Sequence, residues 1–196
     1  TFGQAEVQEA RQSGEDVYDI ICRNVSPEPE NLLVLPHFTV TGTPHFDTQS
    51  RGAILGLTLN TPKKQIVAAV LSGVTYEMKL NLEMLQSAGV TLNRLRAIGG
   101  GAKSRTWVQR KADIMGMPVA VLETTEAAAF GVAMLAGRGV GAVASIEDMV
   151  KHAVKFAYGC EPDETRRRAF QERFEVYRDV YPALRDINRR LAQIEK

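Results

Sequence analysis

The sequence is poor in the residues that build metal centres and disulfide frameworks. Its 196 residues include two cysteines, Cys22 and Cys160, and three histidines. Two cysteines without a C-x-x-C spacing indicate neither a zinc motif nor a disulfide scaffold, so we expect reduced and inert thiols. His37, His45 and Asp47 follow an H-x7-H-x-D spacing that matches no metal motif. We therefore assign no metal ligands in this chain.

Long apolar runs and an excess of one charge are also absent. No segment approaches the roughly 20 apolar residues that cross a bilayer, and the first residues lack a signal-peptide pattern. Twenty-four basic side chains balance 23 acidic ones, and the basic run 166–168 is interpreted as a solvated helix face. We expect a cytoplasmic protein with no nucleic-acid or membrane partner, and a homodimer is compatible with this composition. Because the chain begins at Thr1 without methionine, we expect a piece of a longer protein.

Helix and strand signals alternate in the first half of the chain. A polar helical stretch over about 3–23 precedes a Ser-Pro-Glu-Pro break, strands are expected over 32–35 and 53–59, and the segment 39–51 between them is expected to be an extended loop. Thr61-Pro62 begins the longest predicted helix, which Gly89 ends. Its apolar stripe contains Val67, Val70, Leu71, Val74, Met78, Leu82 and Leu85.

Strand and helix signals then follow in pairs. A strand over 95–98, a helix over 104–115, a strand over 119–122 and an alanine-rich helix over 126–135 predict an α/β domain with a mixed or mainly parallel sheet flanked by helices. Beyond Ser145 the pattern is helical to the end of the chain. Apolar residues spaced by threes and fours from Phe170 to Ile194 predict core packing rather than a coiled coil, because Pro182 interrupts them.

The most informative segment is LRAIGGGAKSRTWVQRKADIMG, residues 95–116. A short strand leads into three glycines, then into a polar Lys-Ser-Arg step that opens an amphipathic helix. Glycines let the backbone approach a ligand closely, and the N–H groups and dipole of a helix N-terminus attract an anion. The segment predicts a phosphate-binding turn, although a glycine turn without a ligand fits these residues equally well.

Two well-known phosphate loops do not fit this turn. The P-loop pattern requires a glycine directly before the lysine, where Ala102 stands. The dinucleotide pattern requires a glycine where Ser104 stands. A dinucleotide-dependent oxidoreductase is therefore the weakest hypothesis for this chain.

The chain contains three separated motifs: RGAILGLTLNTPKKQIVAAVLSGVTYE, the GGGAKS turn with its trailing W-x-x-x-x-A-D-I-x-G, and EAAAFGVAMLAG. Together they resemble the carboxyl-terminal domain of FGGY carbohydrate kinases. PHFTVTGTPHFDTQSRG and EPDETRRRAFQERFEVYRDVYPAL are similar to segments of the xylulose kinase branch. The resemblance implies one ribonuclease H-like (actin-like ATPase) domain over residues 1–196 with a helical carboxyl-terminal extension. It also implies that the amino-terminal, sugar-binding and catalytic domain is absent from this chain.

The resemblance implies that the parent protein transfers the γ-phosphate of ATP, bound with Mg²⁺, to a hydroxyl of a pentulose or related polyol. The family's catalytic aspartate belongs to the amino-terminal domain, so neither Asp47 nor Asp113 is assigned to that role. We expect the isolated domain to be inactive. The alternative hypothesis is a non-catalytic, actin-like module that binds or senses a nucleotide.

The resemblance also implies which residues contact the nucleotide. The family's second and third glycines back onto it, and Arg105 stands where the family often has a polar residue near adenine or ribose. Ser104 is interpreted first as the helix N-cap and second as a ligand, and Lys103 as a charge for phosphate or for solvent. The predicted nucleotide-binding residues are Gly100, Gly101, Ala102, Lys103, Ser104 and Arg105.

Overall fold

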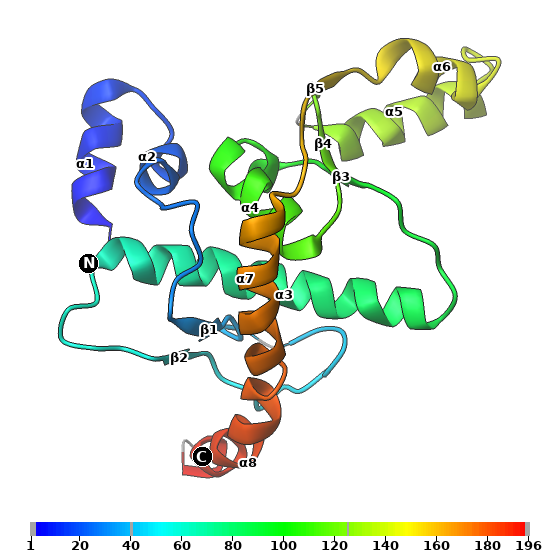
Figure 1. Cartoon of the computed structure of the whole chain (residues 1–196). Coiled ribbons are helices and arrows are strands. Elements are labelled where there is room, and N and C mark those ends of the chain that lie inside the picture. The colour runs from blue at the N-terminus through cyan, green and yellow to red at the C-terminus, as the bar shows by residue number, and fades with distance from the viewer. Residues whose placement is uncertain (1–2, 40, 125, 195–196) are drawn as a thin grey trace.

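Helix α3 (Lys63–Ser87) is the central element of the computed structural model, which describes residues 3–194 except 40 and 125. Figure 1 shows the other elements arranged around this helix. Helix α2 and strand β1 both contact it, and β1 pairs antiparallel with β2 so that Val34 lies opposite Ile54. The elements that precede α3 are α1 (Gln4–Ser13), α2 (Val17–Arg23), β1 (Leu33–Leu35) and β2 (Ala53–Leu55).

A three-stranded sheet of order β3-β4-β5 positions the glycine turn. Strands β3 (Leu95–Ala97) and β4 (Val119–Leu122) are parallel, and β5 (Phe156–Cys160) is antiparallel to β4. The crossover from β3 to β4 contains the 3₁₀ turn η1 and helix α4, so the turn lies at the carboxyl end of β3. The remaining helical elements are η1 (Gly100–Ala102), α4 (Arg105–Met115), α5 (Ala127–Gly139), α6 (Ile146–Ala153), α7 (Glu164–Tyr177) and α8 (Val180–Ile194).

The sheet is mixed, and the prediction of an all-helical segment beyond Ser145 is wrong because β5 interrupts it. The residues of this strand, Phe-Ala-Tyr-Gly-Cys, are too few to show an alternating pattern on their own. They become a strand by pairing with β4, where Val119 lies opposite Cys160. A contact between distant residues therefore decides this element.

The first predicted helix is two helices. Gly14 adopts a left-handed φ of 74° and its N–H bonds to the Ala10 carbonyl, which ends α1. Asp16 then caps α2 by accepting the Tyr18 N–H at 2.8 Å. The expected strand 53–59 is similarly cut short at Gly56, whose φ is 87°. The loop expected over 39–51 has no strand in its described part, and residue 40 lies outside the described residues.

The apolar stripe of α3 is not its buried face. Met78 and Leu85 are exposed, and the other stripe residues are only half-buried. Strand β1 instead packs closely on Gly73, where a Cβ would come within 2.1 Å of the Val34 carbonyl oxygen. Small residues permit this close approach and so determine which side faces the core. The buried residues of α3 are Ala68, Ala69, Ser72, Gly73, Thr75, Tyr76 and Lys79.

The apolar residues spaced by threes and fours from Phe170 to Ile194 are buried in the core only in the first half of that segment. Phe170, Phe174 and Tyr177 are almost fully buried in a cluster with Tyr76 and Ile114, as predicted. In α8, by contrast, Ile187, Leu191 and Ile194 are exposed. Pro182 lies in the first turn of α8, where its missing N–H costs no helix hydrogen bond. The core prediction is therefore wrong for the end of this helix.

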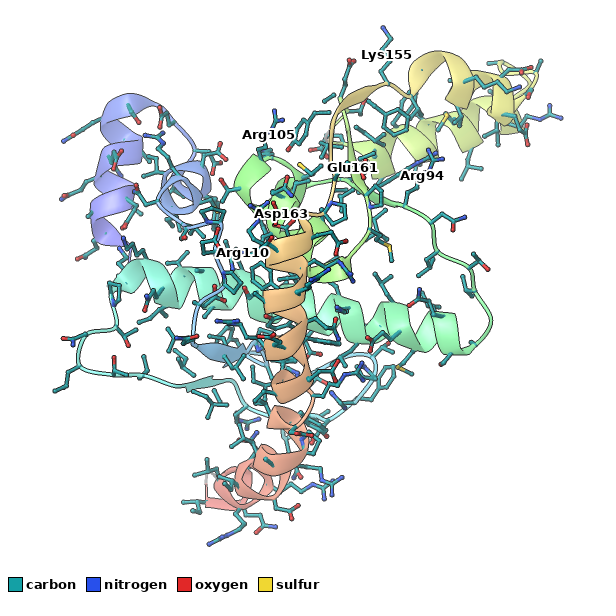
Figure 2. All side chains as sticks on the ribbon, in the orientation of Figure 1. Arg94, Arg105, Arg110, Lys155, Glu161 and Asp163 are labelled. Atoms are coloured by element: carbon teal, nitrogen blue, oxygen red, sulfur yellow. The ribbon has the colours of Figure 1, made fainter. Side chains whose placement is uncertain are left out.

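A buried ion pair joins several of these elements. Arg110 of α4 donates to Glu30 Oε2 at 2.8 Å, and the two side chains are 1% and 4% exposed. The same guanidinium donates to Ser72 Oγ of α3 and lies over the Phe170 ring of α7. Figure 2 labels Arg110 at this junction. The pair fixes α4 against α3, α7 and the segment before β1.

The loop after β1 is held by a second polar cluster. The Glu77 carboxylate accepts the Tyr177 hydroxyl at 2.6 Å, and His37 Nε2 lies 3.4 Å from the same oxygen. His37 Nδ1 and Ser50 Oγ are 2.7 Å apart. His45 stacks on the Tyr181 ring, whose hydroxyl donates to Asp47. The histidines of the H-x7-H-x-D spacing thus contact α3 and α8.

Replacing Glu77 by glutamine should destabilise the fold in a pH-dependent way. Burial alone would raise the pKa of this carboxyl, but its contacts with His37 and Tyr177 hold the pKa below the usual 4.5. A lowered folded-state pKa contributes stability above the unfolded-state pKa and loses it as the pH falls. Urea unfolding should therefore show a loss of about 1–3 kcal/mol at pH 7 that shrinks below pH 4.5. A constant difference across this range would contradict the assignment.

Candidate functional site

The glycine turn is a short 3₁₀ helix that leads directly into α4. Gly99 has a φ of 71°, and the turn closes through the Ala102 N–H to the Gly99 carbonyl at 3.0 Å. The Lys103 N–H bonds to the Gly100 carbonyl at 3.2 Å. The prediction that Ser104 is the N-cap of α4 is confirmed, because its Oγ accepts the Trp107 N–H.

This turn forms one wall of a cavity of about 680 Å³. The opposite walls are α2 and the first half of α3, so three elements that are distant in sequence meet around it. The lining is largely apolar, with acidic groups from α2 and a lysine from the turn. The lining residues are Asp16, Tyr18, Asp19, Ile21, Cys22, Val67, Val70, Leu71, Gly100, Gly101, Lys103, Ser104 and Trp107.

Four of the six predicted nucleotide-binding residues line this cavity, and two do not. Ala102, the last residue of the turn, is 5% exposed, and its carbonyl accepts the Tyr158 hydroxyl at 3.2 Å. The Arg105 guanidinium lies 5.1 Å from the centroid of the Tyr158 ring. Arg105 lines a separate hollow of about 350 Å³ with Gln109 and Asp113, and Figure 2 labels it on α4.

Sequence reasoning missed the cavity residues of α2. Asp16, Tyr18 and Asp19 lie in a stretch that shows only a polar helical pattern, and nothing in that pattern points to a ligand. The α3 wall did carry a signal, since Val67, Val70 and Leu71 belong to the apolar stripe of that helix. A stripe that the core leaves partly uncovered is available to line a site. Burial raises the pKa of the Cys22 thiol in the same wall, which keeps it unreactive.

A buried lysine that does not line this cavity supports the turn. Lys111 is 8% exposed, and its Nζ donates to the Gly101 carbonyl at 2.8 Å. The same nitrogen lies 4.1 Å from the centroid of the Trp107 ring. Trp107 Nε1 in turn donates to Thr75 Oγ1 of α3 at 3.2 Å. Burial lowers the pKa of the Lys111 ammonium, because a charged amine is poorly solvated there.

Asp113 is bound by protein groups. It is 1% exposed, and its carboxylate accepts the Asp163 N–H at 2.8 Å and Arg166 Nε at 2.7 Å. Gln109 Nε2 donates to it as well. These bonds fasten α4 to the start of α7, which is a structural role.

Among the residues that the structure describes, no group of three or more histidine, cysteine, aspartate or glutamate side chains is placed to hold a metal ion. Within the same residues, no helix is both long and apolar enough to cross a bilayer.

The comparison with known sequences identifies the family. Residues 3–140 match the FGGY family of carbohydrate kinases, C-terminal domain. The chain is 31% identical over 165 residues to the xylulose kinase of Bacillus subtilis (strain 168), covering 84% of this chain and 33% of that protein. This chain therefore belongs to the FGGY family of carbohydrate kinases, as its motifs predicted. It spans about a third of the length of the curated relatives that it matches.

Solved structures confirm the predicted actin-like ATPase fold. The xylulose kinase from Rhodospirillum rubrum superposes with a TM-score of 0.76 at 23% identity, over 96% of this chain and 38% of that one. The Plasmodium falciparum glycerol kinase with ADP superposes with a TM-score of 0.67 at 21% identity, over 89% of this chain and 36% of that one. At these identities the likeness establishes the fold.

Alanine at neighbouring glycines of the turn should have unequal effects. A Cβ at Gly101 would lie 3.1 Å from Lys111 Nζ and 3.2 Å from the Trp107 ring, whereas a Cβ at Gly100 meets nothing within 4 Å. We expect Gly101→Ala to lower the free energy of unfolding by about 1–2 kcal/mol through overpacking. Gly100→Ala, the matched control, should change it by less than about 0.5 kcal/mol. Equal effects in urea unfolding would mean that Gly101 is not packed as described.

Proposed function

We propose that this chain is the nucleotide-binding part of an ATP-dependent sugar kinase and that the cavity beside the glycine turn receives the adenine nucleotide. The observation that carries the proposal is the junction of a glycine turn, the N-terminus of α4 and an apolar cavity of about 680 Å³. Each part suits a different portion of a nucleotide. Ligand pockets of this kind combine apolar walls with a few polar groups.

The walls match the chemistry of the ligand. The α3 residues Val67, Val70 and Leu71 offer an apolar surface to a base. Lys103 offers positive charge to phosphates at the opposite wall. Carboxylates from α2, those of Asp16 and Asp19, can accept hydrogen bonds from ribose hydroxyls.

The phosphates would meet a restricted set of backbone groups. The N–H groups of Ala102 and Lys103 already bond within the turn. The Trp107 N–H is likewise bound to Ser104 Oγ. An anion would therefore use the N–H groups of Gly100, Gly101 and the first residues of α4, Arg105 and Thr106. Ala102 is buried at the end of the turn, and Arg105 would reach the nucleotide with its side chain only after leaving Tyr158. Mg²⁺ would be held mainly by phosphate oxygens and water.

Phosphoryl transfer would require a second domain. The reaction depends on positioning and on neutralising phosphate charge, which closure of two domains supplies. We place the sugar-binding residues and the catalytic aspartate in a preceding domain, because the chain spans 33% of its xylulose kinase relative. The relatives named xylulose kinase favour a xylulose-like pentulose as the sugar substrate. A parent whose preceding domain lacks that aspartate would instead be a nucleotide-sensing module.

A carboxylate placed on the turn should weaken nucleotide binding without unfolding the chain. Gly100→Asp fits sterically, because a Cβ there meets nothing within 4 Å. Its charge would repel phosphate, so we expect Mg-ADP affinity to fall about tenfold or more. Gly139→Asp on α5 is the matched control, because its Cβ position is equally open, and it should leave binding unchanged. Calorimetry with Mg-ADP, Mg-ATP and NAD at fixed salt is the measurement.

The outcomes separate the hypotheses. Unchanged Mg-ADP binding in Gly100→Asp would locate the nucleotide elsewhere. Tighter binding of NAD than of ADP would favour an oxidoreductase.

The isolated chain should not phosphorylate sugars. We expect no transfer of phosphate from ATP to D-xylulose above the rate of a reaction without protein, because the catalytic base and the sugar site belong to the missing domain. A coupled ADP-release assay measures the rate of phosphate transfer. A parallel reaction without the sugar reports any contaminating ATPase. Sugar-dependent turnover by the purified chain would contradict the proposed division of the site.

A further inference from the structure

We propose that Lys111 is a positioning residue, which fixes the shape of the glycine turn from outside the nucleotide cavity. The inference deepens the proposed function, since it concerns how the turn presents its backbone to phosphates. Lys111 does not line the nucleotide cavity. It acts on the ligand through two residues that do line it, Gly101 by a hydrogen bond and Trp107 by a ring contact.

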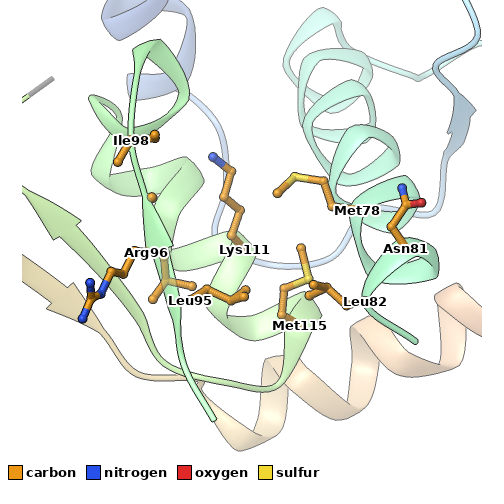
Figure 3. Close-up of a pocket in the computed structure, with 10 residues that line it drawn as sticks. Met78, Asn81, Leu82, Leu95, Arg96, Ile98, Lys111 and Met115 are labelled. Atoms are coloured by element: carbon orange, nitrogen blue, oxygen red, sulfur yellow. The ribbon is translucent and has the colours of Figure 1, made fainter. Parts of the chain in front are cut away.

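Lys111 reaches the turn through a second cavity. This cavity, of about 400 Å³, lies between β3, α3 and α4. Figure 3 shows the Lys111 side chain extending from α4 between β3 and the α3 residues Met78 and Asn81. Its ammonium reaches the Gly101 carbonyl at 2.8 Å. The two cavities share no lining residue, and the hydrogen bond from Lys111 to the Gly101 carbonyl connects the second cavity to the glycine turn.

The hydrogen bond completes the fixation of one peptide plane. The carbonyl of Gly101 and the N–H of Ala102 belong to the same planar unit. Lys111 binds the oxygen of this unit, and the Gly99 carbonyl binds its N–H at 3.0 Å. A peptide plane held at both ends cannot rotate, so the neighbouring glycine N–H groups keep one direction. Glycines would otherwise move freely between several conformations.

The charge of Lys111 has no carboxylate to balance it in the second cavity. Apart from Lys111, the charged residue among those lining this cavity is Arg96, whose guanidinium lies 5.4 Å from the Phe156 ring centroid. The ammonium is stabilised by the Gly101 carbonyl and the face of Trp107. Burying an ammonium this way is costly. Phosphate bound at the turn would supply the missing negative charge.

A purely structural lysine is the competing explanation, and the chain contains a matched control for it. Lys79 is 9% exposed, its Nζ donates to the Ile114 carbonyl at 2.7 Å, and it lies over the Phe174 ring. It therefore shares burial, carbonyl partner and aromatic contact with Lys111. Lys79 contacts neither the turn nor the nucleotide cavity. Its replacement reports the effect of losing any buried lysine.

The first experiment compares Lys111→Met with Lys79→Met. Both variants should lose a similar amount of thermal stability, since methionine fills most of the space and removes the charge. At a temperature where both are folded, Mg-ADP affinity should fall about tenfold in Lys111→Met and stay within about twofold of the wild type in Lys79→Met. Equal affinities in a folded Lys111→Met and the wild type would overturn the proposal.

The second experiment needs no variant and no nucleotide. In carbon- and nitrogen-labelled wild-type chain, NMR would follow the Lys111 Cε and the Gly101 carbonyl carbon as the pH rises. We expect both signals to change together, at a pH below the usual range for lysine because burial lowers this pKa. If the signal of the Gly101 carbonyl carbon does not change while Lys111 titrates, the proposal is overturned. Joint titration in a chain that binds no nucleotide would preserve the role of Lys111 in the turn and reject the proposed function.

Discussion

The buried ion pair of Arg110 and Glu30 is the interaction on which the arrangement of this domain depends. It joins α4 to the segment before β1, while the same guanidinium reaches Ser72 of α3 and the Phe170 ring of α7. A buried pair adds little stability relative to a packed apolar core, but an unpaired buried charge costs roughly 3–5 kcal/mol. Packings that separate these groups are therefore strongly disfavoured. Because α4 begins at the glycine turn, the pair also determines where that turn faces α3.

Two cavities are connected to the glycine turn in different ways. Gly100 and Gly101 line the cavity between the turn, α2 and α3, and the second cavity contains the lysine that binds the Gly101 carbonyl. Helix α3 contributes to both cavities through its apolar stripe, with Val67, Val70 and Leu71 in one and Met78 and Leu82 in the other. The face of α3 that contains Gly73 packs closely in the core, and its apolar stripe is left to line the two cavities. One helix can therefore line a ligand site without leaving a void in the core.

Much of the site was predictable because its signals are local. The glycines, the Ser104 cap and the positive charge of Lys103 are consecutive in sequence, and the structure places the turn at the end of β3. The direction of Arg105 was not predictable, because Tyr158 from another strand attracts it. The role of Lys111 was hidden as well, since a lysine within an amphipathic helix normally faces solvent. Its partner becomes evident only when the turn folds back over α4.

Sequence patterns predicted the order of most helices and strands, the glycine turn and its cap, and the family. These features depend on residues within a few positions of one another, where backbone preferences and hydrogen bonds act directly. Packing between distant segments decided that α3 buries the face containing Gly73 and not its apolar stripe, that 156–160 pairs as a strand, and that α2 completes the cavity. Such outcomes depend on close packing and pairing between residues far apart in the chain. For β5 that partner is β4, and for the buried face of α3 it is the hairpin strand β1.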